Sequence, residues 1–195
     1  MPPGDDAPAT PFPPGTVAAF FSPREKARRA LWYMVAATLF RCSFRRADGW
    51  RAMLLRAFGA KVGARCLIRR SAWIEIPWNV TIGDDVMLGE HCIIYSLGHI
   101  TIGDRAVISQ YSHLCGGSHD YRTRGMMLLR VPVTIGADAW IAADAFVGPG
   151  VTVGEGTIVG ARSSVFSNLP AWKICVGNPA RVLKDRVPLD PEGTP

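Results

Sequence analysis

From Ile135 to Leu169 the chain places an aliphatic residue at every sixth position. These residues are Ile135, Ile141, Val147, Val153, Val159 and Val165. The residue four places after each of them is compact in every case but one, Leu169. An α-helix repeats near 3.6 residues and a simple strand near 2, so a period of six fits neither. The period is typical of a parallel β-helix, in which three six-residue sides make a coil of about 18 residues.

The same period continues toward the N-terminus and predicts a β-helix over residues 61–170. The further inward positions are Val62, Ile68, Ile82, Leu88, Ile94, Ile102, Ile108 and Leu114. In the first coil, Ile74 and Ile76 compete for the third inward position. A long excursion breaks the repeat after Ser118. Because loops carry chemistry more often than regular repeats do, we expect the functional site in residues 118–132.

Helical patterns precede the repeat. Ser22 and Pro23 suit the N-cap and first position of a helix that should reach about Phe40, and a second helix is predicted from about Asp48 to Gly59. This preface, residues 22–60, would cap the open end of the solenoid. The alternative is a segment that lies on a membrane surface, built from Trp32, Tyr33, Trp50 and the arginines.

Both ends of the chain differ in composition from the repeat. Residues 1–21 hold six prolines and few charges, and we expect a flexible tail. In the C-terminal extension, residues 171–195, Asn178 and Pro179 suit the start of a short helix that would end near Val187. The final residues should be loose.

Positive charge is concentrated in the preface. Residues 24–70 contain thirteen Lys or Arg and two acidic residues, whereas the chain from Ser71 onward has nine basic and twelve acidic residues. Such a segment suits an anionic membrane surface or a phosphorylated substrate. Nucleic acid is not expected as a partner, because no recognised nucleic-acid-binding module accompanies the charge. No apolar run approaches the length of a membrane span and no secretory signal is evident, so a cytoplasmic location is expected.

Among the four histidines, His119 stands at the root of the excursion. A neutral imidazole at the edge of a cleft can take a proton from a substrate hydroxyl near neutral pH. His91 lies in the middle of a coil side, His99 in a two-residue insertion between Ile94 and Ile102, and His113 at a corner. All three suit ordinary surface or corner positions. His119 is therefore the candidate general base.

The hexads, the His-bearing loop and the ending VGNPARV resemble the hexapeptide-repeat O-acetyltransferases. More narrowly, five segments resemble the colanic-acid biosynthesis acetyltransferase subgroup. They are RAMLLRAFGAKVG, PWNVTIGDD, ITIGDRAVISQYSHLCGGSHDY, VGARSSVFSNLP and VGNPARVL. The resemblance covers about residues 24–187. It implies a left-handed parallel β-helix, hence an all-β fold with a helical preface and a short C-terminal helix, assembled as a homotrimer with active sites between subunits. It also implies acetyl-CoA as donor and a hydroxyl, usually on a sugar, as acceptor.

The resemblance also implies roles for individual residues. His119 matches the family's catalytic histidine, and Asp120 and Glu90 are the nearest candidates by sequence to orient it. The coenzyme A groove of relatives would touch Trp140, Ala143 and Ala161, with Arg162, Arg181 and Lys184 suitably charged for its phosphates. Tyr121, Arg122 and Arg124 lie on the loop and are candidates for acceptor contacts by position alone. A backbone N–H of the adjoining subunit would stabilise the oxyanion.

Two positions depart from galactoside and maltose acetyltransferases of the same fold. Phe166 and Ser167 replace a Thr-Lys pair after the last rung, and Leu97 replaces a carboxylate before the third coil. The second change indicates an acceptor other than a simple galactoside. The sequence therefore predicts an O-acetyltransferase of exopolysaccharide or related glycan biosynthesis, whose acceptor is a sugar, a nucleotide sugar or a lipid-linked glycan, with possible peripheral contact with an anionic membrane.

Two alternatives use the same scaffold. One is a non-catalytic solenoid that serves as a binding platform. The other is a zinc hydrolyase similar to the γ-class carbonic anhydrases. His113 and His119 are six residues apart, which places them on successive sides of a coil instead of side by side. No metal is therefore expected.

Overall fold

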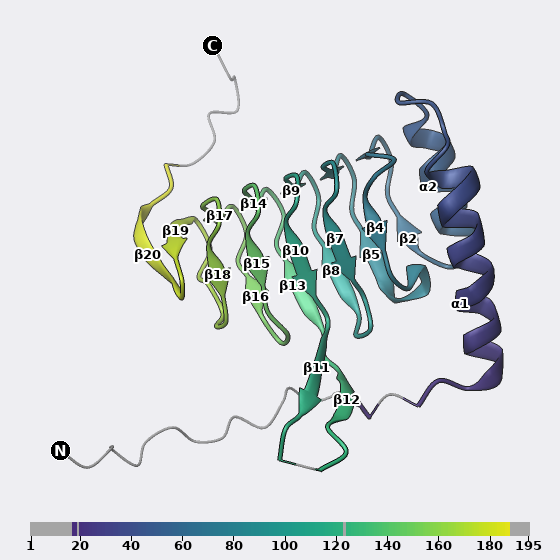
Figure 1. Cartoon of the computed structure of the whole chain (residues 1–195). Coiled ribbons are helices and arrows are strands. Elements are labelled where there is room, and N and C mark those ends of the chain that lie inside the picture. Colours follow the sequence, from purple (N-terminus) through teal and green to yellow (C-terminus); the bar gives the residue numbers. More distant parts are fainter. Residues whose placement is uncertain (1–16, 19, 123, 188–195) are drawn as a thin grey trace.

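The computed structural model describes residues 17–18, 20–122 and 124–187, and shows a parallel β-helix with helices at one end (Figure 1). One face is the sheet of β2 (Lys61–Val62), β5 (Val80–Ile82), β8 (Ile100–Ile102), β13 (Val133–Ile135) and β16 (Thr152–Val153). The second is built from β3 (Leu67–Ile68), β6 (Met87–Leu88), β9 (Val107–Ile108), β14 (Trp140–Ile141) and β17 (Ile158–Val159). The third comprises β4 (Trp73–Ile74), β7 (Ile93–Tyr95), β10 (His113–Cys115), β15 (Phe146–Val147) and β18 (Ser164–Val165).

The inward aliphatic residues stack in register from coil to coil, as the six-residue period predicts. In the first sheet Ile82 pairs with Ile102, Ile102 with Ile135, and Ile135 with Val153. All four are nearly inaccessible to solvent. Burying one such side chain contributes about 1.5–3 kcal/mol, so the repeat itself stabilises the solenoid.

The irregular third side of the first coil has a simple geometry. Ile74 takes the inward position, because it pairs with Ile94 of the next coil. Ile76 is also buried, and its N–H donates to Ser96 Oγ over 2.9 Å. A single 3₁₀ turn, η2 (Pro77–Asn79), then leads into β5.

One corner of the solenoid carries a ladder of charged residues with positive φ. Arg65 and Asp85 form one ion pair of 2.6 Å, and Arg105 and Asp138 form another of 2.7 Å. At the same corner Gly83 leaves no room for a side chain, since a Cβ there would lie 2.1 Å from Asp104 Oδ1. The compact turn between coils therefore depends on a glycine.

The preface consists of α1 (Pro23–Val35), a π-helical turn η1 (Ala36–Phe40) and α2 (Asp48–Ala57). Ser22 caps α1 as predicted, accepting a hydrogen bond from the Glu25 N–H. Trp32 is buried and its indole N–H donates to the Ile74 carbonyl over 2.8 Å. The helices lie against the first coil, which is the arrangement that the capping interpretation predicts (Figure 1).

A buried arginine locks α2 to this coil. The Arg51 side chain is inaccessible to solvent, donates to the Ile68 carbonyl, and pairs with Asp48 over 3.0 Å. Its guanidinium also donates to Ser43 Oγ and to the carbonyls of Phe44 and Arg45. These partners satisfy the buried charge and hold α2 against the first coil. Arg is suited to this role because its donors form a rigid fork.

The C-terminal extension differs from the prediction. A short helix from Asn178 to about Val187 was expected, but residues 173–185 form an antiparallel hairpin of β19 (Lys173–Gly177) and β20 (Ala180–Asp185). β19 pairs with β17, so the hairpin extends the second face beyond the last coil. The edge of that sheet offers backbone partners that the local Asn-Pro signal cannot register, and the strand forms there instead of the helix.

The excursion is a second antiparallel hairpin, β11 (Gly117–Asp120) with β12 (Met127–Arg130). It leaves the solenoid between β10 and β13 and projects away from it (Figure 1). The predicted flexible tail lies mostly outside the described residues, but β1 (Val17–Ala18) pairs with β12 as a third strand. Among the described residues, no helix is long and apolar enough to cross a membrane.

Candidate active site

His119 lies on β11, opposite Leu128 of β12, with its side chain exposed. Its Nδ1 is 2.6 Å from the Met126 carbonyl oxygen. A carbonyl can only accept, so Nδ1 carries the proton and donates it. The neutral ring then has its lone pair on Nε2, which is the form that a general base requires.

Met126 supplies this contact through its backbone. It is a non-glycine residue with a positive φ of 40° at the end of the hairpin turn. A positive φ is uncommon for such a residue and is often found at functional positions. No side-chain signal marks a backbone carbonyl in a sequence, which is why sequence reasoning did not find this partner of His119.

The two predicted orienting carboxylates make other contacts in the described chain. Asp120 accepts hydrogen bonds from the Arg122 backbone N–H and side chain, and these bonds hold the pKa of Asp120 below its usual value. Glu90 accepts a hydrogen bond from Ser71 Oγ at the corner between the second and third faces. Neither of these contacts involves His119. Within one copy of the chain, the Met126 carbonyl is the group that bonds to His119 Nδ1.

The predicted acceptor residues lie beyond the strand that carries His119. Tyr121, Arg122 and Arg124 are all exposed at the tip of the hairpin. Arg122 pairs with Asp120 at 3.0 Å. The three residues therefore lie on the same projecting hairpin as His119, within five residues of it in the sequence.

The predicted donor residues gather on the second face and the corner after it. Trp140 lies on β14 with 44% of its surface exposed, and its indole N–H donates to Ser109 Oγ. Ala143 and Ala161 occupy equivalent corner positions in successive coils, where the Arg162 N–H donates to the Ala143 carbonyl. Arg162 also pairs with Asp144 over 3.3 Å at this exposed corner.

The two remaining predicted donor residues are on the terminal hairpin. Arg181 and Lys184 both lie on β20 and are exposed. Because β20 extends the second face, all six predicted donor residues belong to that face or to its following corner. The hairpin with His119 leaves from a different corner, between the third and first faces. One chain therefore does not bring the base and the donor residues together.

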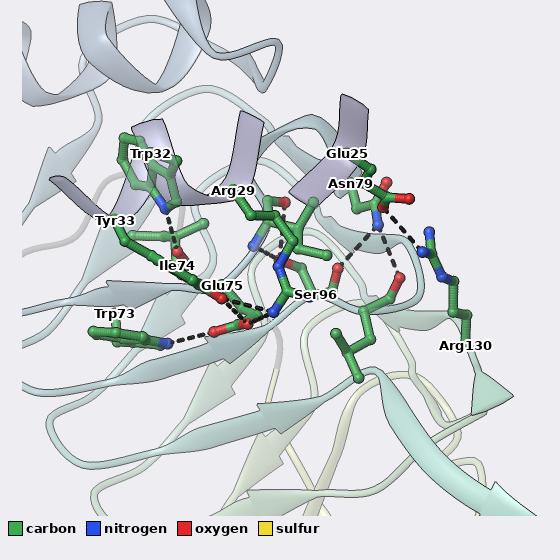
Figure 2. Close-up of polar contacts among 12 residues, drawn as sticks. Glu25, Arg29, Trp32, Tyr33, Trp73, Ile74, Glu75, Asn79, Ser96 and Arg130 are labelled. Atoms are coloured by element: carbon green, nitrogen blue, oxygen red, sulfur yellow. Dashed lines mark hydrogen bonds and ion pairs between the residues drawn. The ribbon is translucent and has the colours of Figure 1, made fainter. Parts of the chain in front are cut away.

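A buried polar cluster joins the preface to the first coil, and sequence reasoning missed it. Glu75 is 7% exposed and accepts hydrogen bonds from Arg29, the Tyr33 hydroxyl and the Trp73 indole (Figure 2). Burial, followed by the hydrogen bond to Glu75, raises the pKa of Tyr33. These bonds keep a buried carboxylate satisfied and fix where α1 sits.

A second contact ties α1 to the hairpin itself. Arg130 of β12 pairs with Glu25 of α1 over 2.9 Å (Figure 2). The Phe21 ring lies under both the Arg130 and Arg29 guanidinium groups, at 4.7 and 4.3 Å. The preface thus contacts both the first coil and the element that carries His119.

No group of three His, Cys, Asp or Glu side chains that could hold a metal ion occurs within the described part of the chain. His113 lies between the rings of Tyr95 and Phe146 on the third face, away from His119 on the hairpin. The zinc alternative therefore has no supporting ligand cluster among these residues.

Comparisons with known proteins agree with the parallel β-helical fold. The family described as bacterial transferase hexapeptide (six repeats) matches residues 132–167, and the hexapeptide repeat of succinyl-transferase matches residues 79–109. The chain is 51% identical to the putative colanic acid biosynthesis acetyltransferase WcaF of Escherichia coli K12, over 80% of this chain and 86% of that protein. It is 36% identical to nodulation protein L of Rhizobium leguminosarum bv. viciae, over 70% and 73% of the two chains.

Among solved structures, a hexapeptide-repeat acetyltransferase of Vibrio cholerae in complex with acetyl coenzyme A is similar, with a TM-score of 0.78 and 25% identity. The match covers 86% of this chain and 91% of that one. The chain therefore belongs to the hexapeptide-repeat acetyltransferases. Within that family it falls in the colanic acid biosynthesis acetyltransferase subgroup.

Proposed function

We propose that this enzyme transfers the acetyl group of acetyl-CoA to a sugar hydroxyl in the assembly of an exopolysaccharide or a related glycan, with His119 as general base. The observation that carries the proposal is the hydrogen bond from His119 Nδ1 to the Met126 carbonyl, which leaves Nε2 free to accept a proton. The 51% identity to a putative colanic acid biosynthesis acetyltransferase supports the glycan acceptor.

The chemistry needs no covalent enzyme intermediate. His119 Nε2 accepts the proton of the acceptor hydroxyl while the hydroxyl oxygen attacks the thioester carbonyl carbon. The carbon–sulfur bond then breaks, and the proton passes to the departing sulfur, giving an acetyl ester and free coenzyme A. The oxyanion formed in between requires an N–H donor, for which we propose a backbone amide of an adjoining subunit.

The test is release of the coenzyme A thiol, measured for the wild type, His119→Ala and His119→Asn across sugars, nucleotide sugars and lipid-linked glycans. We expect turnover in both variants to fall by about 10²- to 10⁴-fold, because a general base contributes about that factor. His119 is exposed, so thermal unfolding should be unchanged. Turnover by His119→Ala at the wild-type rate would refute the role of His119.

We further propose that the active enzyme is a homotrimer in which one chain supplies His119 and a neighbour supplies the donor groove. The separation of these residues on different corners of one chain supports this arrangement. Light scattering on the purified protein gives the oligomeric state. In addition, two inactive variants, His119→Ala and Ala161→Trp, should regain part of the activity when they are mixed and refolded together. Mixtures that stay inactive would place both groups in one chain.

The preface also supports a proposal of peripheral contact with the inner face of an anionic membrane. Two of the expected residues are engaged elsewhere, because Trp32 is buried and Tyr33 is bonded to Glu75, whereas Trp50 is exposed as expected. The other exposed apolar residues of the preface are Leu31, Met34, Leu39 and Met53 on the helices and Phe44 between them. Arg41 and Arg45 accompany them, and each basic residue near such a surface contributes about 1 kcal/mol. Sedimentation with vesicles should show a preference for anionic over neutral lipid.

A further inference from the structure

A pocket of about 410 Å³ lies between the first turns of α1, the turn η2 and the strand β12. Its lining residues are Arg24, Glu25, Arg28, Trp78, Asn79 and Arg130. Figure 2 shows Glu25, Asn79 and Arg130 gathered on this side of α1. None of these residues belongs to the donor groove or to the hairpin tip, so the pocket is a separate feature of the molecule.

The pocket carries an excess of positive charge. Three guanidinium groups face one carboxylate, that of Glu25, which leaves a net charge of +2 from three positive charges and one negative. Glu25 is paired with Arg130. Arg24 is exposed and has no ion pair recorded within the described residues. Arginine forks match the geometry of phosphate oxygens, so such a lining favours a phosphate-bearing ligand.

Two of the three guanidinium groups, those of Arg28 and Arg130, are held in place. Arg28 lies over the Trp78 ring at 4.1 Å and donates to the Phe58 carbonyl over 2.7 Å. The Asn79 amide donates to the Ser96 and Leu97 carbonyls. Because these side chains are already ordered, a ligand that binds them loses less conformational entropy on binding.

The pocket adjoins the face of the hairpin that carries His119. Arg130 lies opposite Gly117 and His119 lies opposite Leu128 in the same ladder. Paired residues, and residues two apart on one strand, point to the same side of a sheet. His119 and Arg130 therefore share one face as diagonal neighbours, whose Cα atoms are typically about 7–8 Å apart.

We propose that this pocket binds a diphosphate group carried by the acceptor sugar, and so places the sugar beside His119. The inference rests on the proposed sugar acetyltransferase activity. Diphosphate is the group that joins a sugar either to a nucleoside or to a polyprenyl lipid, and the pocket recognises what the two carriers share.

The first experiment measures binding of inorganic pyrophosphate by calorimetry, with coenzyme A at saturation so that the donor's own phosphate contacts are filled. Arg24→Gln and Arg130→Gln should each weaken pyrophosphate binding by about tenfold, the effect of losing one charge-assisted contact. Arg46→Gln is the matched control: it removes one exposed charge of the preface outside this pocket, and should leave binding unchanged.

The variant Glu25→Gln separates ligand binding from a purely structural role. It breaks the Glu25–Arg130 pair but removes the only carboxylate of the pocket, so it should strengthen pyrophosphate binding several-fold. If the pair served only to hold the hairpin, Glu25→Gln and Arg130→Gln would change the affinity for pyrophosphate in the same direction. That result would overturn the proposal, as would tighter binding of glucuronate than of pyrophosphate.

The second experiment compares acetyl transfer to one sugar in three forms: free, as its nucleoside diphosphate ester, and as its farnesyl diphosphate ester. Arg24→Gln should raise KM about tenfold for whichever diphosphate ester is the better acceptor and leave the free sugar unaffected. The preferred ester identifies the carrier. Equal effects of Arg24→Gln on all three forms would overturn the proposal that the pocket binds diphosphate. If the wild type released no coenzyme A thiol with any acceptor, the proposed function itself would be refuted.

Discussion

The coils of the solenoid and the hairpin that leaves them are stabilised in different ways. In the coils between the first and the last, each inward residue lies between aliphatic residues above and below, and each strand except the terminal ones pairs on both sides. The hairpin has β11 at the edge of a three-stranded sheet, and its exposed residues include His119 and Tyr121. Stability thus comes from the repeat, whereas the proposed general base lies on the segment that interrupts it.

The largest effect that separates the two regions should come from a coil. Ile141 is inaccessible to solvent and pairs with Ile108 and Val159. We expect Ile141→Ala to lower the free energy of unfolding by about 2–5 kcal/mol, because it leaves a cavity between stacked side chains. Urea denaturation measures this loss. His119→Ala is the matched comparison, and an equal loss there would show that the hairpin also carries the fold.

Hydrogen exchange should show a smaller contrast. The backbone amides of β8 and β13 lie in central strands of the solenoid, whereas residues 121–122 and 124–126 lie exposed at the turn of the hairpin. We expect the turn amides to exchange at least about 10²-fold faster, since local opening of an exposed turn needs much less free energy than opening of a core strand. Equal protection would mean that the hairpin opens only with the whole solenoid.

The smallest effect concerns pH. Burial of His113 between Tyr95 and Phe146 lowers its pKa below 6.5, and its Nε2 has no hydrogen-bond partner in the described structure. The unfolded chain therefore binds a proton more readily than the folded one as the pH falls below 6.5. The free energy of unfolding should therefore decrease as the pH is lowered from 7.5 to 5.5. In His113→Phe the urea midpoint should change less over this range; parallel curves would show that His113 contributes nothing.

The regular part of the fold could be predicted from the sequence because one period fixes both the inward residue and the corner residue. Ile135, Ile141 and Val147 alone define three faces of one coil. The choice between Ile74 and Ile76 needed the pairing with Ile94, which is a contact between coils. The C-terminal hairpin was missed because its strand depends on the edge of β17, about fifteen residues earlier in the chain.

The candidate site was predictable only in part. His119 could be found because a titratable side chain at the start of an insertion leaves a signal in the sequence. The Met126 carbonyl could not, since any residue has one and only the backbone conformation aims it. The pairing of Glu25 with Arg130 spans 105 residues and depends on how α1 sits against the coil. Contacts of this kind come from packing, which local pattern does not describe.

The two ends of the excursion meet inside the solenoid. The Val131 N–H donates to the Gly116 carbonyl over 3.0 Å, and Gly98 of the preceding coil contacts both residues. The packing of the coils above and below therefore does not depend on the length or the sequence of the excursion. Mutation can lengthen, shorten or replace it without disturbing the coils, and lineages that share this scaffold can diversify their acceptors while inheriting its stability unchanged.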